Sequence, residues 1–371
     1  MLAGEELLAW VKLTRTPALD FTILSAALGL FGSARALVTA SEVAWKSAGI
    51  PSTARQYLSR TAHCGSNAER DWLDHPGHHL VPFVDPRYPA MLYSSGGGPA
   101  ALYVAGDPEV LNEPQLAIVG ARNPTPQGRQ NAADFAERLA EHGLAITSGL
   151  ADGIDTAAHR GALNGQGSTV AVLGSGIDII YPRGNLALSR EIERQGALIS
   201  EFPLGTAPRR QNFPQRNRII AALSLGTLVV EAARRSGSLI TARLAGDHGR
   251  EVFAIPGSIH NPLSRGCHEL IRQGAKLTET ADDILTELNF SAFFALAKPT
   301  PAAAVPAPGM DNEHKILLDA LGFDPVDLDA LVVRTGFKPE AVSSMMLILE
   351  LEGHVQAAPG GRYSRVVRSR R

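Results

Sequence analysis

Residues 144–155 read Leu-Ala-Ile-Thr-Ser-Gly-Leu-Ala-Asp-Gly-Ile-Asp. The apolar beginning predicts a buried strand over Leu144–Ser148, and the glycine-containing turn after it opens a helix. The same succession of strand, glycine-rich turn and helix recurs from about residue 115. The other predicted strands are Leu116–Gly120, Thr169–Gly174, Ala197–Glu201, Thr227–Glu231 and Glu251–Pro256. Because helical patterns such as Gly128–His142 and Leu186–Gln195 lie between these apolar runs, the sequence predicts an α/β fold with a doubly wound, mainly parallel sheet.

Further patterns flank this region, so the sequence predicts four parts. Residues 1–75 have apolar side chains at helical spacing and a glycine-containing turn between Ile23 and Ala40, which resembles a helix-hairpin-helix or sterile-alpha-motif-like bundle. Residues 76–295 hold the α/β domain, and residues 296–311 are a Pro/Ala-rich linker. Residues 312–371 show three helical patterns and a strand-turn-strand pattern, which is the order of a winged helix. The elements expected there are Glu313–Leu321, Val326–Thr335, Pro339–Glu352 and His354–Val367.

The composition limits the class of protein. The chain has 371 residues, of which 44% are hydrophobic and 19% charged, as is typical of a folded protein with two or three domains. The formal net charge is -2, so any site for a polyanion is a local patch on a near-neutral body. Two cysteines, Cys64 and Cys267, cannot build a disulfide framework or a zinc-binding spacing. Acidic Glu5 and Glu6 near the N-terminus and the lack of a membrane-length apolar run lead us to expect a cytoplasmic protein with no membrane partner.

The most basic segment is Pro208-Arg-Arg-Gln-Asn-Phe-Pro-Gln-Arg-Asn-Arg-Ile219. Its arginines are Arg209, Arg210, Arg216 and Arg218, and it contains no acid. Guanidinium groups suit phosphate because they are planar and permanently charged. The ring of Phe213 offers a face on which an unstacked base can lie. The alternative is a solvated basic loop with Phe213 packed into the core, and composition alone does not separate the two readings.

Loops rich in glycine and serine follow the predicted strands at their carboxyl ends. Backbone N–H groups at such turns and at helix N-termini bind anions, and glycine lets a phosphate approach the main chain closely. In a doubly wound sheet these strand ends share one edge. We therefore expect one site for polyphosphate or nucleic acid in preference to a set of ordinary tight turns. Its candidate residues, besides Arg210, are Arg122, Ser148, Gly149, Gly176, Arg183, Asn185, Arg235, Ser236, Gly237 and Ser238.

Cofactor and catalytic motifs are incomplete. Ile179 stands where a dinucleotide-binding fingerprint needs its third glycine, and no Gly-Lys-Ser/Thr P-loop is present, so NAD binding and ATP hydrolysis are not expected. His159 is expected on a helix surface or at an interface. Glu231 is expected to orient Arg or Asn side chains or to act in acid–base chemistry. We therefore predict no catalytic residue, no cofactor and no metal.

Seven motifs, in this order, resemble those of the bacterial DNA-processing protein A family (DprA, also called Smf). They are Gly120-Ala-Arg122, Ser148-Gly-Leu-Ala-Asp-Gly-Ile-Asp155, Gly174-Ser-Gly-Ile-Asp-Ile-Ile-Tyr-Pro182, Glu201-Phe-Pro-Leu-Gly205, Phe213-Pro-Gln-Arg-Asn-Arg-Ile-Ile220, Glu231-Ala-Ala-Arg-Arg-Ser-Gly-Ser-Leu-Ile-Thr241 and Val252-Phe-Ala-Ile-Pro-Gly257. The resemblance covers the region from about residue 80 to residue 290 closely. It implies an extended Rossmann-like domain, with the flanking helical and winged-helix domains in the family's usual layout.

The same resemblance implies a function. The protein would bind single-stranded DNA without sequence preference, protect incoming strands and load the RecA recombinase during natural transformation. It would act as a homodimer through its Rossmann-like domain, and members of the family are not known as enzymes. Arg122 and Arg210 would contact DNA, and Phe213 would face a base. Asn217 and Arg218 would line the same groove, and Arg216 belongs to the same motif.

Two departures and two rival functions accompany this hypothesis. Gln127 stands where the family often has an aromatic residue, and His268 stands where Asn is usual. The first rival is a nucleotide-processing enzyme of the phosphoribohydrolase kind, but its Pro-Gly-Gly-x-Gly-Thr motif is absent. The second is a duplex-specific regulator led by the winged helix. Its expected recognition helix, Pro339–Glu352, carries three glutamates, which suits a duplex groove poorly, whereas the tail Arg362–Arg371 is basic.

Overall fold

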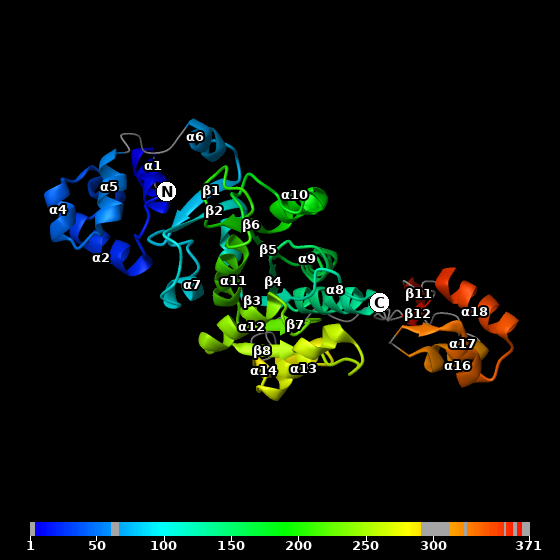
Figure 1. Ribbon diagram of the computed structural model, residues 1–371. Helices are drawn as coiled ribbons and strands as arrows, with labels where there is room; N and C mark the ends of the chain where they lie inside the picture. Colours follow the sequence, from blue (N-terminus) through cyan, green and yellow to red (C-terminus); the bar gives the residue numbers. More distant parts are fainter. Residues whose placement is uncertain are drawn as a thin grey trace.

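The computed structural model describes residues 4–60, 67–290, 312–322, 325–351, 354–358 and 362–365. A nine-stranded sheet with the order β1-β2-β6-β5-β4-β3-β7-β8-β9 forms the centre of the molecule (Figure 1). Its strands are β1 (His78–Pro82), β2 (Ala101–Gly106), β3 (Gln115–Val119), β4 (Ala145–Ser148), β5 (Thr169–Val172), β6 (Ala197–Ser200), β7 (Gly226–Val229), β8 (Glu251–Ala254) and β9 (Lys276–Leu277). Strands β3 to β9 pair in parallel, and only β1 and β2 run antiparallel to their neighbours. The predicted doubly wound, mainly parallel sheet is therefore confirmed.

All six strands predicted from the sequence are present, and most end one or two residues earlier than predicted. The difference has one cause: ladder pairing stops where the chain turns into the loop at the carboxyl end, although apolar residues continue into that loop. Strands β1, β2 and β9 were not predicted. The last of these has only two residues, both exposed, so it carries no apolar pattern.

Helices cover both faces of the sheet, because alternate residues of each strand enter two different cores. In β3, Ala117 and Val119 belong to one core and Leu116 and Ile118 to the other. The helices of this domain are α7 (Ala90–Ser94), α8 (Pro126–Glu141), α9 (Ile154–Asn164), α10 (Leu186–Gln195), α11 (Asn212–Leu223), α12 (Ser238–Asp247), α13 (Arg265–Arg272) and α14 (Ala281–Glu287). Short 3-10 helices lie at η1 (Pro108–Asn112), η2 (Arg183–Asn185) and η3 (Pro262–Ser264).

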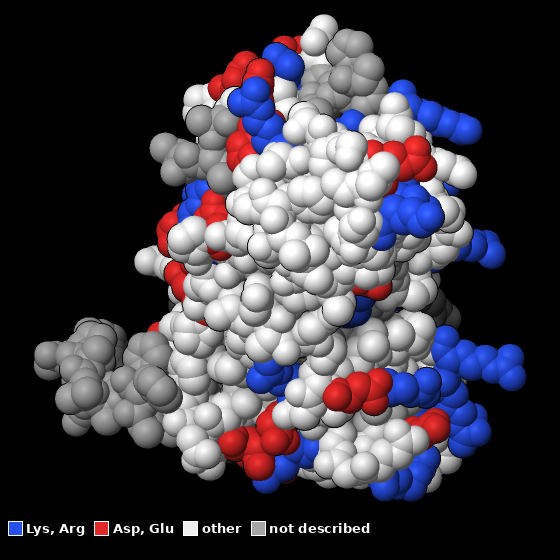
Figure 2. All heavy atoms as spheres, turned by 90° about the vertical axis from the view of Figure 1, so that its left-hand side faces the viewer, with Lys and Arg blue, Asp and Glu red and all other residues white. Residues whose placement is uncertain are grey.

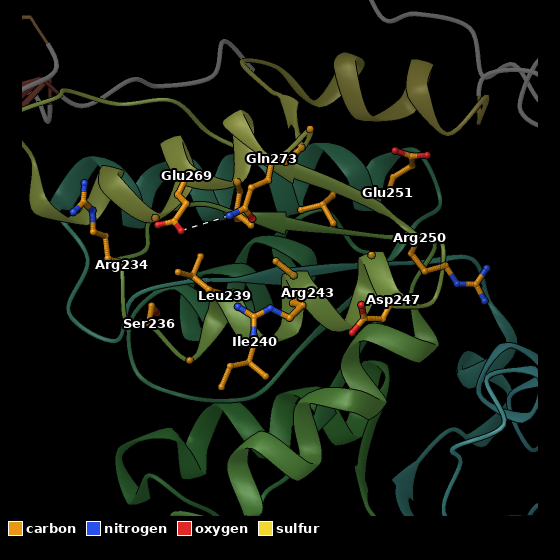
Figure 3. A pocket seen from close by; sticks show the side chains of 18 of the residues that line it. Arg234, Ser236, Leu239, Ile240, Arg243, Asp247, Arg250, Glu251, Glu269 and Gln273 are labelled. Atoms are coloured by element: carbon orange, nitrogen blue, oxygen red, sulfur yellow. Dashed lines mark hydrogen bonds between the residues drawn. The ribbon is translucent and has the colours of Figure 1, made fainter.

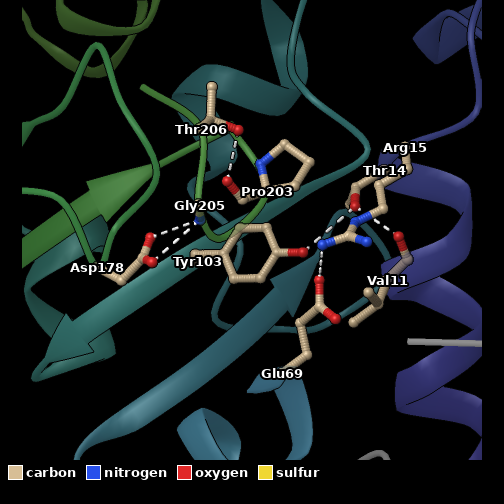
Figure 4. Close-up of polar contacts among 9 residues, drawn as sticks. All are labelled: Val11, Thr14, Arg15, Glu69, Tyr103, Asp178, Pro203, Gly205 and Thr206. Atoms are coloured by element: carbon tan, nitrogen blue, oxygen red, sulfur yellow. Dashed lines mark hydrogen bonds and ion pairs between the residues drawn. The ribbon is translucent and has the colours of Figure 1, made fainter. Parts of the chain in front are cut away.

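The N-terminal region is helical, as predicted. It consists of α1 (Glu5–Thr14), α2 (Phe21–Phe31), α3 (Ala34–Thr39), α4 (Glu42–Ser47), α5 (Ser52–Arg60) and α6 (Asn67–Leu73). These helices share a core with the antiparallel edge of the sheet: the ring of Phe83 lies 5.5 Å from that of Trp10 and 4.8 Å from that of Phe21. Figure 4 shows the polar side of this junction, where the Thr14 hydroxyl lies 3.5 Å from the hydroxyl of buried Tyr103. The packing therefore continues across the predicted boundary between residues 75 and 76.

The C-terminal region is a winged helix with its own core of Leu317, Leu331, Val342 and Leu349. Its elements are α16 (Asn312–Leu321), β10 (Val326–Asp327), α17 (Leu328–Thr335), α18 (Pro339–Leu351), β11 (Val355–Ala358) and β12 (Arg362–Arg365). The sequence placed the start of the second helix at Val326, which is wrong by two residues. Val326 and Asp327 pair with β12 instead, and the Asp327 carboxylate caps α17 by accepting a hydrogen bond from the Ala330 amide at 2.7 Å.

Some predicted features lie outside the described residues. They are the linker 296–311, Cys64, the Pro359–Gly361 turn and the basic tail beyond Arg365. Over the ranges that the structure covers, no helix is long and apolar enough to cross a membrane.

Candidate nucleic-acid interface

The loops at the carboxyl ends of β3, β4, β5 and β7 meet the first turns of α11 and α12 in one hollow of about 550 Å³. This convergence follows from the topology, because these four strands are neighbours in the sheet and their ends share one edge. The predicted residues that line the hollow are Arg122, Arg210, Phe213, Arg216, Asn217, Ser236, Gly237 and Ser238. Residues separated by more than 100 positions in the sequence thus meet in one place.

Phe213 is half-buried in the wall of this hollow and does not belong to the apolar core. The guanidinium carbon of Arg122 lies 5.3 Å from the centroid of the Phe213 ring. A Cβ atom at Gly174 would come within 2.8 Å of the same ring, so glycine is needed behind it. Of the two readings of the basic segment, the geometry favours a half-buried ring at the hollow, beside the guanidinium of Arg122, over a ring packed into the core.

Tyr181 is a site residue that the sequence analysis did not select. It is 46% exposed, lines the same hollow, and its ring lies 5.9 Å from that of Phe213 at an interplanar angle of 39°. Its position at the end of the glycine-rich loop that follows β5 is the feature of the sequence that could have identified Tyr181 as a site residue. Two aromatic rings, those of Phe213 and Tyr181, therefore line the hollow.

Arg216 lies beneath the hollow and is buried. Its guanidinium donates hydrogen bonds to the carbonyl oxygens of Gly149, at 2.6 Å, and of Val172. Burial lowers the pKa of Arg216 to about 10, while nearby Asp155 counters this effect. Arg216 therefore joins the ends of β4 and β5 to α11, so that most of its donors are directed at protein atoms.

Three more predicted residues act as supports for the loops. The Ser148 hydroxyl is buried and donates to the Ile118 carbonyl at 2.6 Å. Buried Asn185 donates to the Leu150 carbonyl at 2.9 Å. At Gly176 the amide donates to the Thr206 carbonyl at 2.8 Å, which ties two loops together. The structure thus places these side chains and this amide under the surface of the site, where they fix the loop conformations.

Asp155 organises the turn after β4. Its carboxylate accepts hydrogen bonds from the amides of Gly149, at 3.1 Å, and Ala151, at 3.4 Å. Burial raises the pKa of Asp155, and the neighbouring guanidinium of Arg216 opposes that shift. The buried carboxylate and guanidinium therefore hold the glycine turn from both sides.

The remaining predicted arginines lie elsewhere. Arg183, on η2, and Arg235, in the loop after β7, are exposed and do not line the hollow that contains Phe213. Arg235 instead lines a hollow of about 620 Å³ between α12 and α13. That second hollow shares Ser236, Gly237 and Ile240 with the first. Figure 3 shows its mixed charge, with Arg243 across from the hydrogen-bonded pair Glu269 and Gln273.

Arg218 faces a third hollow, of about 580 Å³, between the N-terminal helices and α11. Its guanidinium donates to the Glu201 carboxylate and to the Gly97 carbonyl. Asn217 and Arg218 therefore lie on different sides of α11, although the family resemblance implied that they line one groove.

Charge is unevenly distributed over the surface. Seen from the side of the N-terminal helices, the molecule presents a broad uncharged area, with Lys and Arg side chains projecting along one edge (Figure 2). Within the ranges listed for the fold, no group of three or more His, Cys, Asp or Glu side chains could hold a metal ion.

Two acid–base candidates have structural partners. His159 is fully buried and not on a helix surface, which corrects the expectation from the sequence: its Nδ1 lies 2.7 Å from the Thr169 hydroxyl. Glu231 accepts hydrogen bonds from the amide and the hydroxyl of Thr125, and no Arg or Asn side chain in the described part of the chain donates to it. Of the two departures from the family pattern, His268 contacts the Gly257 carbonyl at 2.9 Å and Gln127 donates to Asn131 at 2.6 Å. Neither lines the hollow that contains Phe213.

Comparisons with known proteins agree with this architecture. A family model described as DNA recombination-mediator protein A matches residues 79–289, and a second, described as DprA winged helix domain, matches residues 299–361. Protein Smf of Escherichia coli (strain K12) is 44% identical over 299 residues, which cover 78% of this chain and 78% of that protein. The X-ray structure of DNA processing protein A (DprA) from Streptococcus pneumoniae aligns with a TM-score of 0.66 and 34% identity, covering 77% of this chain and 99% of that one. A Helicobacter pylori DNA processing protein A, whose structure concerns its single-stranded DNA binding mode, aligns with a TM-score of 0.53 and 30% identity, covering 58% of this chain and 98% of that one.

Proposed function

Because this chain belongs to the DNA recombination-mediator protein A family, we propose that it binds single-stranded DNA in the hollow at the carboxyl edge of its sheet. The observation that carries the proposal is the grouping of Arg122, Arg210, Phe213 and Tyr181 around one opening. Single-strand binding without sequence preference needs cations for the backbone and ring faces for bases, and this opening offers both.

Each group has a distinct role in the proposal. Arg122 and Arg210 contact phosphates, and the faces of Phe213 and Tyr181 stack on bases. The Ser236–Ser238 segment, at the start of α12, supplies the amide of Gly237 and the hydroxyls of Ser236 and Ser238, which lie 2.7 Å from each other. Asn217 adds an amide to the wall, and exposed Arg183 and Arg235 extend the positive surface beyond the opening. Arg216, Ser148, Gly149, Gly176 and Asn185 keep the loops in position.

The proposal extends to the biological context. The protein acts as a homodimer through its Rossmann-like domain, protects incoming strands and loads the RecA recombinase onto them in the cytoplasm during natural transformation. It acts by binding and has no catalytic step. Support for this part comes from the family and from the relatives named above, one of which is described by its single-stranded DNA binding mode.

Fluorescence anisotropy with a labelled oligo-dT and a matched duplex, over a series of salt concentrations, tests the proposal. We expect preference for the single strand, affinity that falls with salt, and a clear loss of affinity for Arg122→Ala and Arg210→Ala. Each lost phosphate contact should also reduce the slope of log K against log salt by about 0.7. Arg138→Ala, at the far end of α8, is the matched control and should bind as the wild type does.

Two results would contradict the proposal. If the duplex binds as tightly as the single strand or tighter, and if Arg122→Ala and Arg210→Ala do not change its affinity, the DNA-binding site would lie on the winged helix. No binding at all, together with slow hydrolysis of nucleoside monophosphates, would favour the nucleotide-processing enzyme.

A further inference from the structure

Arg218 occupies an unusual position for a DNA contact, because its charge is already satisfied within the protein. One guanidinium nitrogen donates to the Glu201 carboxylate and another donates to the Gly97 carbonyl. The Arg218 side chain is 28% exposed and that of Glu201 only 7%. A phosphate approaching Arg218 would also approach the carboxylate of Glu201, whose negative charge would repel it.

The loop that accepts one of these hydrogen bonds is packed tightly on one side of its acceptor. Gly97 stands in the Gly96–Gly98 segment, which is followed by Pro99. The buried Tyr88 hydroxyl donates to the Pro99 carbonyl at 2.9 Å, and a Cβ atom at Gly98 would come within 2.5 Å of that hydroxyl. The main chain at Gly98 therefore packs closely against Tyr88, so the Gly97 carbonyl that accepts from Arg218 adjoins a tightly packed position, although Gly97 itself is exposed.

The start of α11 depends on such contacts. The residue before the helix, Gln211, makes no side-chain capping hydrogen bond with any residue that the structure describes. The first turns are tied down instead by Asn212, which donates to the Gly174 carbonyl at 3.1 Å, by Arg216 and by Arg218. Phe213 and Asn217, on the same helical turns, face the hollow proposed to bind DNA. Any shift of this part of α11 would move both of them.

We propose that Arg218 is a positioning residue, which holds the DNA-binding face of α11 in register through Glu201 and Gly97 and does not itself contact DNA phosphate. This inference rests on the proposed function of the neighbouring hollow. It differs from the expectation raised by the family resemblance, in which Arg218 lines the groove with Asn217.

Substitution of Glu201 distinguishes the two roles, because they predict opposite signs. If Arg218 contacted phosphate, Glu201→Gln would free the guanidinium and tighten DNA binding. If Arg218 positions α11 through Glu201, the same substitution loosens the helix and weakens binding, by about 3- to 10-fold as for other coupled pairs. The salt slope should stay at the wild-type value in Glu201→Gln and in Arg218→Met, since no phosphate contact is lost.

The experiment measures oligo-dT affinity over a salt series for wild type, Glu201→Gln, Arg218→Met and the double variant. Weaker binding in both single variants, unchanged slopes and a double variant no weaker than the worse single variant support the inference. Unchanged or tighter binding in Glu201→Gln, or a slope reduced by about 0.7 in Arg218→Met, overturns it. Glu141→Gln, which removes a carboxylate from an exposed ion pair on α8, is the matched control.

Two further comparisons distinguish a failure of this inference from other causes of weak binding. Should Arg218→Met fail to fold, the sign of the change in Glu201→Gln decides alone, because that substitution conserves size. Arg122→Ala reports on the proposed function: if wild type binds the oligonucleotide and Arg122→Ala lowers its salt slope, the hollow binds DNA whatever Arg218 does. Failure of the inference is thereby separated from failure of the proposed function.

Discussion

The Glu231 carboxylate holds Thr125, 106 residues away in the sequence, through two hydrogen bonds: from the amide at 2.8 Å and from the hydroxyl at 2.6 Å. Thr125 is the N-cap of α8, and its hydroxyl oxygen accepts a hydrogen bond from the Gly128 amide at 2.9 Å. The contact therefore ties the loop after β7 to the loop after β3, which carries Arg122. Both loops border the hollow proposed to bind DNA.

Replacement of Glu231 tests this link. Glu231→Ala leaves the amide and hydroxyl of Thr125 without their acceptor, so we expect the free energy of unfolding to fall by about 1–3 kcal/mol. Urea denaturation followed by circular dichroism measures this change. Thr125→Ser, which keeps the hydroxyl, should stay close to wild type, whereas Thr125→Val should be destabilised. A free energy of unfolding equal to that of wild type in Glu231→Ala would show that this contact does not stabilise the protein.

His159 predicts a pH dependence of stability. The Thr169 hydroxyl donates its one proton to the Ile146 carbonyl at 2.6 Å, so Nδ1 of His159 must donate to Thr169. Nε2 is buried and makes no hydrogen bond with any residue that the structure covers. Burial, followed by the nearby charge of Arg216, lowers the pKa of His159 from 6.5 to about 3.

The sign of the effect follows from proton binding. Between pH 6.5 and about 3, the unfolded chain protonates His159 and the folded protein does not. The free energy of unfolding should therefore fall as the pH drops through this range, by up to about 1.4 kcal/mol per pH unit. Urea midpoints at a series of pH values should show a flatter dependence for His159→Asn than for wild type. The same dependence in His159→Asn and wild type would refute this assignment.

Phe213 is expected to act on bases and not on phosphates. Loss of a stacking ring costs about 1–3 kcal/mol per base, so Phe213→Ala should weaken oligo-dT binding at every salt concentration without changing the salt slope. Phe213→Trp should retain most of the affinity. An abasic oligonucleotide of equal length provides the check, since wild type and Phe213→Ala should bind it equally well. A difference that persists on the abasic strand would mean that the ring acts through the protein fold.

Two glycines at the site differ in the space available for a side chain. A Cβ atom at Gly149 would clash with the buried Arg216 guanidinium, whereas a Cβ atom at Gly237 would have no atom of the described residues within 4 Å. Gly149→Ala should displace Arg216, lower the melting temperature and weaken DNA binding. Gly237 has a backbone φ of -63°, so Gly237→Ala should keep the fold and is the matched control for stability alone, because Gly237 itself lines the hollow. Thermal melting of both variants measures this contrast, and equal melting temperatures would contradict it.

Much of the fold was predictable from local patterns. Buried parallel strands are short apolar runs, and each turn after such a strand carries glycine or serine, so the six central strands and their loops could be located without tertiary information. The second helix of the winged helix was predicted to begin two residues too early. The residue type of Val326 is compatible with a strand as well as with a helix. Only its pairing with Tyr363 of β12 decides between them.

The site residues divide in a similar way. Residue type and motif order pointed to Arg122, Arg210, Phe213 and the Ser236–Ser238 loop, and the structure brings all of them to one hollow. Tyr181 was overlooked because a single tyrosine in a loop has no pattern of its own. His159 was misjudged because nothing in its neighbours along the chain shows that α9 buries it against β5.

By itself, the sequence determined the alternation of strands and helices, the edge where the loops meet and the chemical character of that edge. The tertiary structure alone decided what each arginine of the basic segment does. Arg216 and Arg218 stand two positions apart on α11, yet one lies buried against the ends of β4 and β5 and the other pairs with Glu201 and Gly97. A guanidinium carries the same charge everywhere, but its burial and its partners come from segments distant in the sequence, and these decide whether it is free to meet a phosphate.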